Sequence, residues 1–309
     1  MLSRIAESLF WIGRYNERAE DTARILDVHF HLLLEDPWVD EFEACRGLLE
    51  IMGVPRPEDG DLDARRVSEL IAYDVTNHSS IVGSLTAARE NAKGAREAIS
   101  SEMWECLNAT YNELPNQVES AGVLGAHNFF RYVKERAAVM AGLADSTLSR
   151  DDGWRFFVLG RSLERVDMTC RLLTARFGEG AGSRGWVTLL RSCSAHEAYL
   201  RTYRRAVDAS LAAEFLLLDR LFPRSVYYAL TLAERCLAEL APSSGRTGSD
   251  DDARRILGRA RTDLEFRQVG ELLDHLPIHL AALETACSEA STAVAGRYFR
   301  QTAAVGWTA

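Results

Sequence analysis

One 17-residue segment occurs twice in the sequence, once near the beginning of the chain and once near its middle. Residues 10–26 read FWIGRYNERAEDTARIL and residues 157–173 read FVLGRSLERVDMTCRLL, with eight of 17 positions identical at a constant spacing of 147 residues. Unrelated segments of this length would share about one residue, so we interpret the match as an internal duplication. A chain built in this way is restricted to folds that contain two similar halves.

A second, weaker similarity accompanies the first at nearly the same spacing. Residues 74–81 resemble residues 219–226, 145 positions later, and in both segments polar residues and a serine precede a long helical pattern. Serine is a common N-terminal cap, so both segments predict the start of a helix. The two similarities together predict two helical units of about 150 residues, one at 1–147 and the other at 148–309.

The periodicity of apolar residues predicts an all-α protein. Apolar positions recur every three or four residues, good helix formers predominate, and no run alternates as a strand would. Prolines stand at the expected helix ends, and 55–62, 178–185 and 242–251 are expected to be loops. We expect the two tandem diverged repeats to pack as one bundle-like molecule with a pseudo-two-fold axis. The predicted helices are 3–34, 39–53, 63–73, 79–99, 101–114, 126–146, 151–177, 185–204, 206–220, 224–240, 250–276 and 278–300.

Charge and hydropathy exclude several classes of protein. The net charge is −9 at pH 7, and no block of lysine and arginine stands out, which argues against a nucleic-acid partner. No window approaches the ~18–20 apolar residues of a membrane span. Acidic residues near the N-terminus also interrupt any signal-peptide core. We therefore expect a cytoplasmic protein without a membrane partner.

Motifs for metals, nucleotides and nucleophiles are missing from the sequence. The six cysteines are scattered without metal-binding spacing, and His275 and His279 flank Pro277, which interrupts a shared helix face. The glycine-rich stretch 178–185 follows a predicted helix and not a strand, so it is interpreted as a linker. No Walker lysine or nucleophile elbow occurs. We expect this chain to bind neither a metal nor a cofactor.

The duplicated segment has two faces when it is drawn as a helix. One face is an apolar stripe, which predicts packing into the core, formed in the first copy by Ile12, Tyr15, Ala19, Ala23 and Leu26. The opposite face is charged. A merely solvated face would diverge fastest after duplication, so charges kept in both copies indicate a covered face. The kept pairs are Arg14 and Arg161, Glu17 and Glu164, Arg18 and Arg165, and Arg24 and Arg171.

Three interpretations of this charged face stay open. In the first, the intrahelical pairs Arg14 with Glu17 and Glu20 with Arg24 would contribute about 0.3 kcal/mol each. In the second, the copies meet, and leaving a buried charge unpaired would cost several kcal/mol. The third is a polar pocket for an anionic or amide-bearing ligand, with arginine as a bidentate clamp. The ion pairs expected from the second interpretation are Arg14 with Glu164 and Arg161 with Glu17.

Several stretches of the sequence resemble the bacterial alpha-E proteins, and the similarity spans essentially the whole chain. Two departures are small: Lys93 stands where arginine is expected, and Asp21 where asparagine is common. The matching stretches are 1–24 (MLSRIAESLFWIGRYNERAEDTAR), 79–82 (SSIV), 88–92 (ARENA), 101–108 (SEMWECLN) and 153–165 (GWRFFVLGRSLER).

This resemblance implies an all-α protein with functional glutamates and arginines. Alpha-E proteins are encoded beside, or fused to, circularly permuted ATP-grasp proteins, often with a transglutaminase-like peptidase nearby. The resemblance therefore implies a partner or co-catalytic subunit of an ATP-grasp-type carboxylate–amine (peptide) ligase, with ATP and Mg²⁺ bound by the ligase. Two alternatives are a free-standing helical enzyme that uses a buried glutamate as general base and a purely structural interaction module.

The candidate site residues follow from the duplicated charges and the resemblance together. Glu17 and Glu164 are the candidate general bases, a role that requires a raised carboxyl pKa. A second group is expected to hold the substrate or the ligase. Its members are Glu7, Arg14, Arg18, Glu20, Arg24, Arg89, Asn91, Glu102, Arg161, Arg165 and Arg171.

Overall fold

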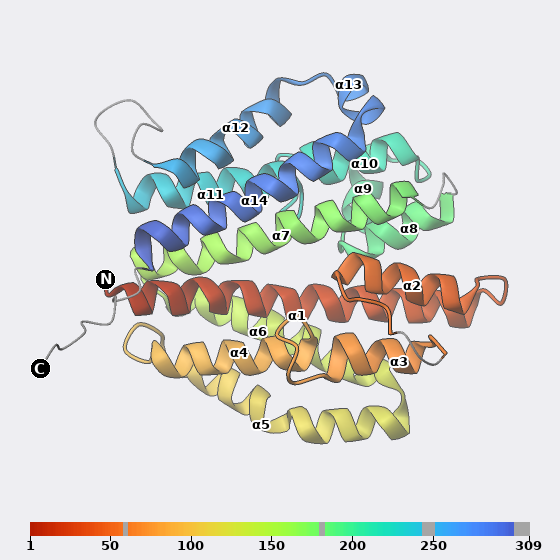
Figure 1. Ribbon diagram of the computed structural model, residues 1–309, viewed down its shortest axis with the longest axis horizontal. Helices are drawn as coiled ribbons and strands as arrows, with labels where there is room; N and C mark the ends of the chain where they lie inside the picture. Colours follow the sequence, from red (N-terminus) through yellow and green to blue (C-terminus); the bar gives the residue numbers. More distant parts are fainter. Residues whose placement is uncertain (58–60, 179–182, 243–250, 300–309) are drawn as a thin grey trace, which may run out of the picture.

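The chain folds into helices and the turns that join them. The computed structural model describes residues 1–57, 61–178, 183–242 and 251–299, and this part contains 14 α-helices, one short π-helix and no strand (Figure 1). The prediction of an all-α protein is confirmed. The α-helices are α1 Ser3–Glu35, α2 Glu41–Met52, α3 Ala64–Ser68, α4 Ile81–Gly94, α5 Ser101–Leu124, α6 Ala126–Thr147, α7 Asp152–Gly178, α8 Ser183–Ser192, α9 His196–Tyr203, α10 Ala209–Leu218, α11 Val226–Leu240, α12 Asp252–Phe266, α13 Val269–Asp274 and α14 Leu276–Tyr298, and the π-helix spans Glu69–Tyr73.

The two long helices α1 and α7 lie side by side at the centre of the molecule (Figure 1). α4 and α6 pack against α1 and are covered by α5, whereas α11 and α14 pack against α7 and are covered by α12. α2 also packs against α7, and α8 against α1. The duplicated segments therefore form the middle layer of the structure, with the remaining helices on either side.

Two glycines allow α1 and α7 to approach each other closely. A Cβ atom at Gly13 would lie 2.1 Å from the carbonyl oxygen of Phe157, and one at Gly160 would lie 2.0 Å from the carbonyl oxygen of Phe10. No real side chain tolerates such distances, so each helix needs glycine where it meets the backbone of the other. This explains why the sequence keeps glycine at both positions of the repeated segment.

Serine caps begin the helices that flank the central pair. Ser80 accepts a hydrogen bond from the backbone of Gly83 at 2.9 Å and starts α4. Ser225 accepts one from Tyr228 at 3.1 Å and starts α11. Both caps were predicted from the weaker similarity and are confirmed, and they fix where α4 and α11 enter the bundle.

Three expectations about helix ends were wrong. α5 continues through Pro115 to Leu124, because the buried residues Leu114 and Ala121 keep that stretch packed despite the lost backbone hydrogen bond. The predicted helix 185–204 is divided between α8 and α9 by a turn in which Ser194 has a φ of 54°. The predicted helix 250–276 is similarly divided between α12 and α13.

The three predicted loops lie partly outside the described residues, at 58–60, 179–182 and 243–250. Of the glycine-rich stretch that was interpreted as a linker, residues 179–182 lie outside the described residues, whereas residue 178 ends α7 and residues 183–185 belong to α8. Among the described helices, none combines the length and the apolar character that a membrane span requires.

Candidate functional site

Glu164 of α7 lies at the contact with α1 and is bound by two arginines of that helix. Its side chain is 1% exposed. Arg14 donates from Nε to Oε2 at 2.6 Å. Arg18 makes a bidentate contact, with Nε 2.5 Å from Oε1 and Nη2 3.1 Å from Oε2. The predicted pair of Arg14 with Glu164 is therefore confirmed, and Arg18 reinforces it.

Glu17 of α1 is held in the same way by an arginine of α7. Arg165 donates from Nε to Oε1 at 2.6 Å and from Nη2 to Oε2 at 3.2 Å, and the Glu17 side chain is 1% exposed. Each central helix thus contributes one glutamate and one arginine that pair with the arginine and glutamate of the other. We call Glu17, Arg18, Glu164 and Arg165 the Glu–Arg cross.

Both glutamates of the cross are strongly acidic. Burial alone would raise the pKa of Glu17, but the charges of Arg224 and Arg165 outweigh it and lower the pKa to about 2. For Glu164 the charges of Arg14 and Arg18 likewise outweigh burial and lower the pKa to about 2. A general base that works near neutral pH needs the opposite shift. The cross therefore consists of permanently ionised, paired groups.

Arg224 gathers three carboxyl groups beside the cross. It lies directly before the cap of α11 and forms ion pairs with Glu17 and Glu20, both at 2.9 Å, and with Asp21. Burial is the largest influence on Asp21. Although Arg224 opposes it, burial and the charges of Glu17 and Glu20 raise the pKa of Asp21 to about 7. Asp21 is thus the carboxyl group of this cluster that exchanges a proton near neutrality.

The sequence interpretation missed Arg224. The segment 219–226 was recognised as a helix start, but its counterpart in the first copy has Ser79 at the equivalent place, so no duplicated charge marked the arginine. The only available signal was an arginine immediately before a serine cap.

Arg161 does not form the ion pair with Glu17 that was predicted for it. Among the described residues no hydrogen bond or ion pair joins the two, because Arg165 and Arg224 already occupy the carboxylate. Burial and the nearby charge of Arg165 lower the pKa of Arg161. The guanidinium instead lies 5.7 Å from the ring centre of Phe157, as Arg14 lies 6.0 Å from that of Phe10.

Intrahelical pairs account for three other predicted residues. Glu20 pairs with Arg24 on α1 as expected, and Arg171 pairs with Asp167 on α7 at 3.0 Å. No described contact joins Arg14 to Glu17, which was the other intrahelical pair considered, since each of these residues is engaged across the helix contact instead.

The remaining predicted residues lie apart from the Glu–Arg cross. Arg89 of α4 hydrogen-bonds Asn108 at 3.2 Å and stacks on Trp104 and Tyr111 of α5. Asn91 donates to a carbonyl of its own helix, that of Ala87, at 2.9 Å. The last two predicted residues are exposed, one in the first turn of α5 and the other on α1, namely Glu102 and Glu7. No described hydrogen bond or ion pair brings these four into the cross.

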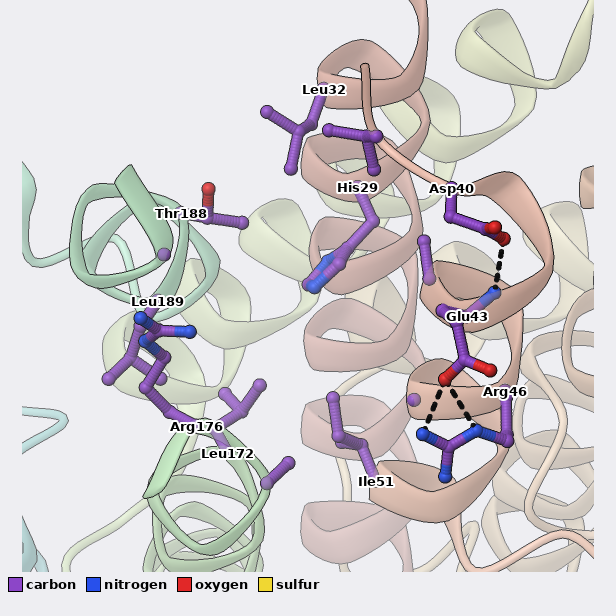
Figure 2. Close-up of a pocket in the computed structure, with 15 residues that line it drawn as sticks. His29, Leu32, Asp40, Glu43, Arg46, Ile51, Leu172, Arg176, Thr188 and Leu189 are labelled. Carbon is purple, nitrogen blue, oxygen red and sulfur yellow. Dashed lines mark hydrogen bonds and ion pairs between the residues drawn. The ribbon is translucent and has the colours of Figure 1, made fainter. Parts of the chain in front are cut away.

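A cavity of about 420 Å³ lies farther along the contact between the central helices (Figure 2). Its walls come from α1 and α2 on one side and from α7 and α8 on the other. This volume lies in the range of small-molecule sites. None of the predicted site residues lines it. The lining residues are His29, Leu32, Val39, Asp40, Glu43, Ala44, Arg46, Gly47, Ile51, Leu172, Ala175, Arg176, Gly185, Thr188 and Leu189.

Polar groups of both signs line this cavity. The His29 Nδ1 donates to the carbonyl of Ile25 at 2.8 Å, which turns the other edge of the ring toward the cavity (Figure 2). Arg176 lies on the α7 wall, while Glu43 and Arg46 form an ion pair at 2.6 Å on the α2 wall (Figure 2). Guanidinium groups therefore lie on both walls of the cavity, and the Glu43 carboxylate on the α2 wall is engaged by Arg46.

The fold and the site define an all-helical protein whose two central helices exchange buried Glu–Arg pairs. The chain belongs to the Alpha-E family, described as a predicted alpha-helical domain with a conserved ER motif, whose profile matches residues 1–299. The sequence contains four Glu-Arg dipeptides, at 17–18, 135–136, 164–165 and 234–235, and the first and third of them form the Glu–Arg cross. The family resemblance inferred from the sequence is thereby confirmed.

Three curated relatives are similar over most of this chain. They are uncharacterized proteins of Mycobacterium bovis and of two strains of Mycobacterium tuberculosis, each 24% identical over 278 residues. The match covers 82% of this chain and 31% of each relative, so this chain spans about a third of the length of these proteins. No solved structure matches the fold.

Proposed function

We propose that this chain is a partner or co-catalytic subunit of an ATP-grasp-type amide (peptide) ligase, and that it holds the substrate or the ligase. ATP and Mg²⁺ would be bound by the circularly permuted ATP-grasp partner, and a transglutaminase-like peptidase is a possible further member of the system. The observation that carries the proposal is that the carboxylates of Glu17 and Glu164 are buried and fully paired. Each is buried, paired with two arginines and has a pKa of about 2, which favours a binding role over a free-standing general base.

The length of the relatives supports a role within a larger assembly. In the mycobacterial proteins the matching region makes up only 31% of the chain, so it works there in one polypeptide with other segments. This is the arrangement expected for a helical unit that serves an enzyme carried elsewhere.

The cavity between α1, α2, α7 and α8 is the proposed place for the substrate. Its facing carboxylate and guanidinium groups match the ammonium and carboxylate ends of an amino acid or a short peptide. The predicted holding role of Arg14, Arg18 and Arg165 then becomes indirect. These arginines fix the distance between α1 and α7 and so shape the cavity.

We also propose that the chain consists of two diverged helical repeats, 1–147 and 148–309, related by an approximate two-fold axis. The reciprocal contacts support this. Gly13 and Gly160 approach the opposite backbone in the same way, and the Glu–Arg cross is made of equivalent residues from each segment. A crystal structure in which α1 to α6 fail to superpose on α7 to α14 would reject the proposal.

Co-expression with an ATP-grasp protein encoded beside this chain tests the function. We expect the two to purify together and the complex to hydrolyse ATP when particular amino acids or peptides are added. Ala175→Phe would fill the cavity and should abolish the substrate-dependent hydrolysis while leaving the complex intact. Ala109→Phe, at an exposed position of α5, is the matched control. The partnership would be rejected if the two proteins failed to co-purify and the ATP-grasp protein hydrolysed ATP at the same rate with and without this chain.

A purely structural interaction module is the second candidate. It is favoured by the ion pairs of the Glu–Arg cross, which are satisfied within the chain and leave neither carboxylate open for a substrate. Under this alternative the complex would form, and the complex that contains Ala175→Phe would hydrolyse ATP as the parent complex does. The same pair of variants therefore separates a substrate-holding subunit from a scaffold.

A further inference from the structure

A cluster of metal-binding side chains lies on the face of α1 that packs against α6, away from the cavity. Asp27 and His31 come from α1, and His127 comes from the first turn of α6. Their potential ligand atoms all lie within 4.8 Å of one another. His127 Nδ1 is 2.6 Å from Asp27 Oδ1, and His31 Nδ1 is 3.4 Å from the same oxygen. Residues a hundred positions apart in sequence thus meet at one carboxylate.

We propose that Asp27, His31 and His127 bind a divalent transition-metal ion of the zinc class. Two imidazoles and one carboxylate are the donor set of many three-residue zinc sites, in which water or a substrate completes the coordination. Ligands around a tetrahedral zinc ion lie about 3.4 Å apart, so distances of up to 4.8 Å between ligand atoms need to shorten by about 1.4 Å, while the 2.6 Å contact of His127 with Asp27 needs to open by about 0.8 Å. The exposed imidazoles of His31 and His127 have room to do so.

The surroundings prepare these groups for a cation. His31 Nδ1 donates to the backbone carbonyl of Asp27 at 2.7 Å, the kind of hydrogen bond that fixes the orientation of metal-binding histidines and leaves Nε2 as the ligand atom. The Asp27 carboxylate is held in place at both oxygens, with Oδ1 2.6 Å from His127 Nδ1 and Oδ2 2.6 Å from Lys134 Nζ.

Lys134 competes with the metal for this carboxylate. Its Nζ lies 2.6 Å from Asp27 Oδ2, so Oδ1 is left for the ion while the ammonium charge opposes it. Removal of this charge should strengthen metal binding. The sequence pattern did not predict this site, because its ligands follow no recognisable spacing.

Zinc titration of the tag-free full-length protein tests the proposal. We expect the chelator-treated protein to bind one Zn²⁺, measured in competition with a chromogenic chelator, and to gain thermal stability with it. His31→Gln and His127→Gln should each weaken binding at least about tenfold, in line with the sensitivity of metal sites to lost partners. Both histidines are exposed, so these variants should fold normally.

Two further variants make the assignment specific. Lys134→Met should bind Zn²⁺ more tightly than the parent, because the competing ammonium is gone. A variant that lacks His275 and His279, the other histidine pair of the chain, should bind as the parent does. The proposal is overturned if the parent takes up no more zinc than the double variant His31→Gln, His127→Gln, or if binding disappears with His275 and His279.

Discussion

At the scale of single residues, the duplicated Glu-Arg dipeptide of the two central helices has a structural meaning. Glu17 and Glu164 lie at 1% exposure, and each is neutralised by arginines from outside its own helix. Buried charges of this kind stabilise a structure only while every partner is present. The motif therefore specifies how two helices meet, and its effect on any chemistry is exerted through that contact.

Loss of one glutamate charge should be severe. Glu164→Gln leaves Arg14 and Arg18 without their common carboxylate, and we expect the free energy of unfolding to fall by about 3–5 kcal/mol. Urea denaturation measures this. Glu7→Gln, on the same helix as these arginines but exposed, should change it by less than about 0.5 kcal/mol. If Glu164→Gln lowered the free energy of unfolding by as little as Glu7→Gln, the Glu–Arg cross would contribute no more than ordinary surface ion pairs.

Removal of the stranded charges should restore part of the lost stability. Arg14→Met with Glu164→Leu still leaves Arg18 unpaired, so its recovery should be incomplete. The triple variant that also carries Arg18→Met contains no lone charge and should recover more. Equal stability of the double and triple variants would argue against the bidentate contact of Arg18.

Asp21 should make the stability depend on pH. Its pKa in the folded protein is about 7, above the ordinary 3.8, so the folded state holds its proton more tightly than the unfolded state. The stability it contributes is complete below about pH 4 and is lost as the pH rises through 7, by at most about 4 kcal/mol. Asp21→Asn should abolish this loss in urea denaturation between pH 5 and 8, whereas exposed Asp61→Asn should not. An unchanged pH profile in Asp21→Asn would contradict the raised pKa. Asparagine would supply the neutral group at every pH.

At the scale of helices, the sequence predicted which segments are helical but not all of their ends. The 3.6-residue period identified α1 and α7 along their whole length, and the serine caps located the starts of α4 and α11. Pro115 misled the prediction because the sequence shows only the backbone hydrogen bond that a proline removes. The tertiary packing that keeps α5 continuous does not appear in the local sequence. The turns that follow α8 and α12 contain no proline and share no characteristic residue type, so no local signal marked these two helix ends.

Gly13→Ala should separate the central helices. The added methyl group would fall 2.1 Å from a backbone oxygen of α7, which is unable to rotate away as a side chain would. Overpacking of this kind costs about 1–3 kcal/mol or more. Gly122→Ala on α5 meets no atom within 4 Å and should stabilise the protein by about 0.5–1 kcal/mol. Equal effects of both variants on the unfolding midpoint would contradict the close approach of α1 and α7.

At the scale of the whole molecule, the duplication pattern located the contact between the halves but not the sites around it. The retained charges predicted that Arg14 reaches Glu164. Arg224, the cavity and the Asp27 cluster stayed hidden because the residues that meet in each of them come from segments far apart in sequence. These clusters depend on how the connecting loops place the outer helices, and the duplicated segment contains no information about that placement.

The two halves should recognise each other without a peptide link. Residues 1–147 and 148–309, produced as separate chains, each expose an unpaired glutamate and arginine on the central helix, so we expect them to be poorly stable alone. Co-expression should yield a one-to-one complex on size-exclusion chromatography. The double variant Gly13→Trp, Gly160→Trp should prevent its formation, since both positions touch the opposite backbone. Two halves that are stable and monomeric by themselves would contradict this expectation.

The Glu–Arg cross also has the form of a self-complementary surface. Each central helix carries both members of the contact, a glutamate to be bound and an arginine that binds, together with the glycine at which the backbones touch. This is the defining property of an isologous interface, the kind by which two identical subunits form a symmetric dimer. Under the proposed duplication, the single chain keeps, inside one polypeptide, the recognition surface of a homodimer, and a half-length ancestor would have needed no partner other than its own copy.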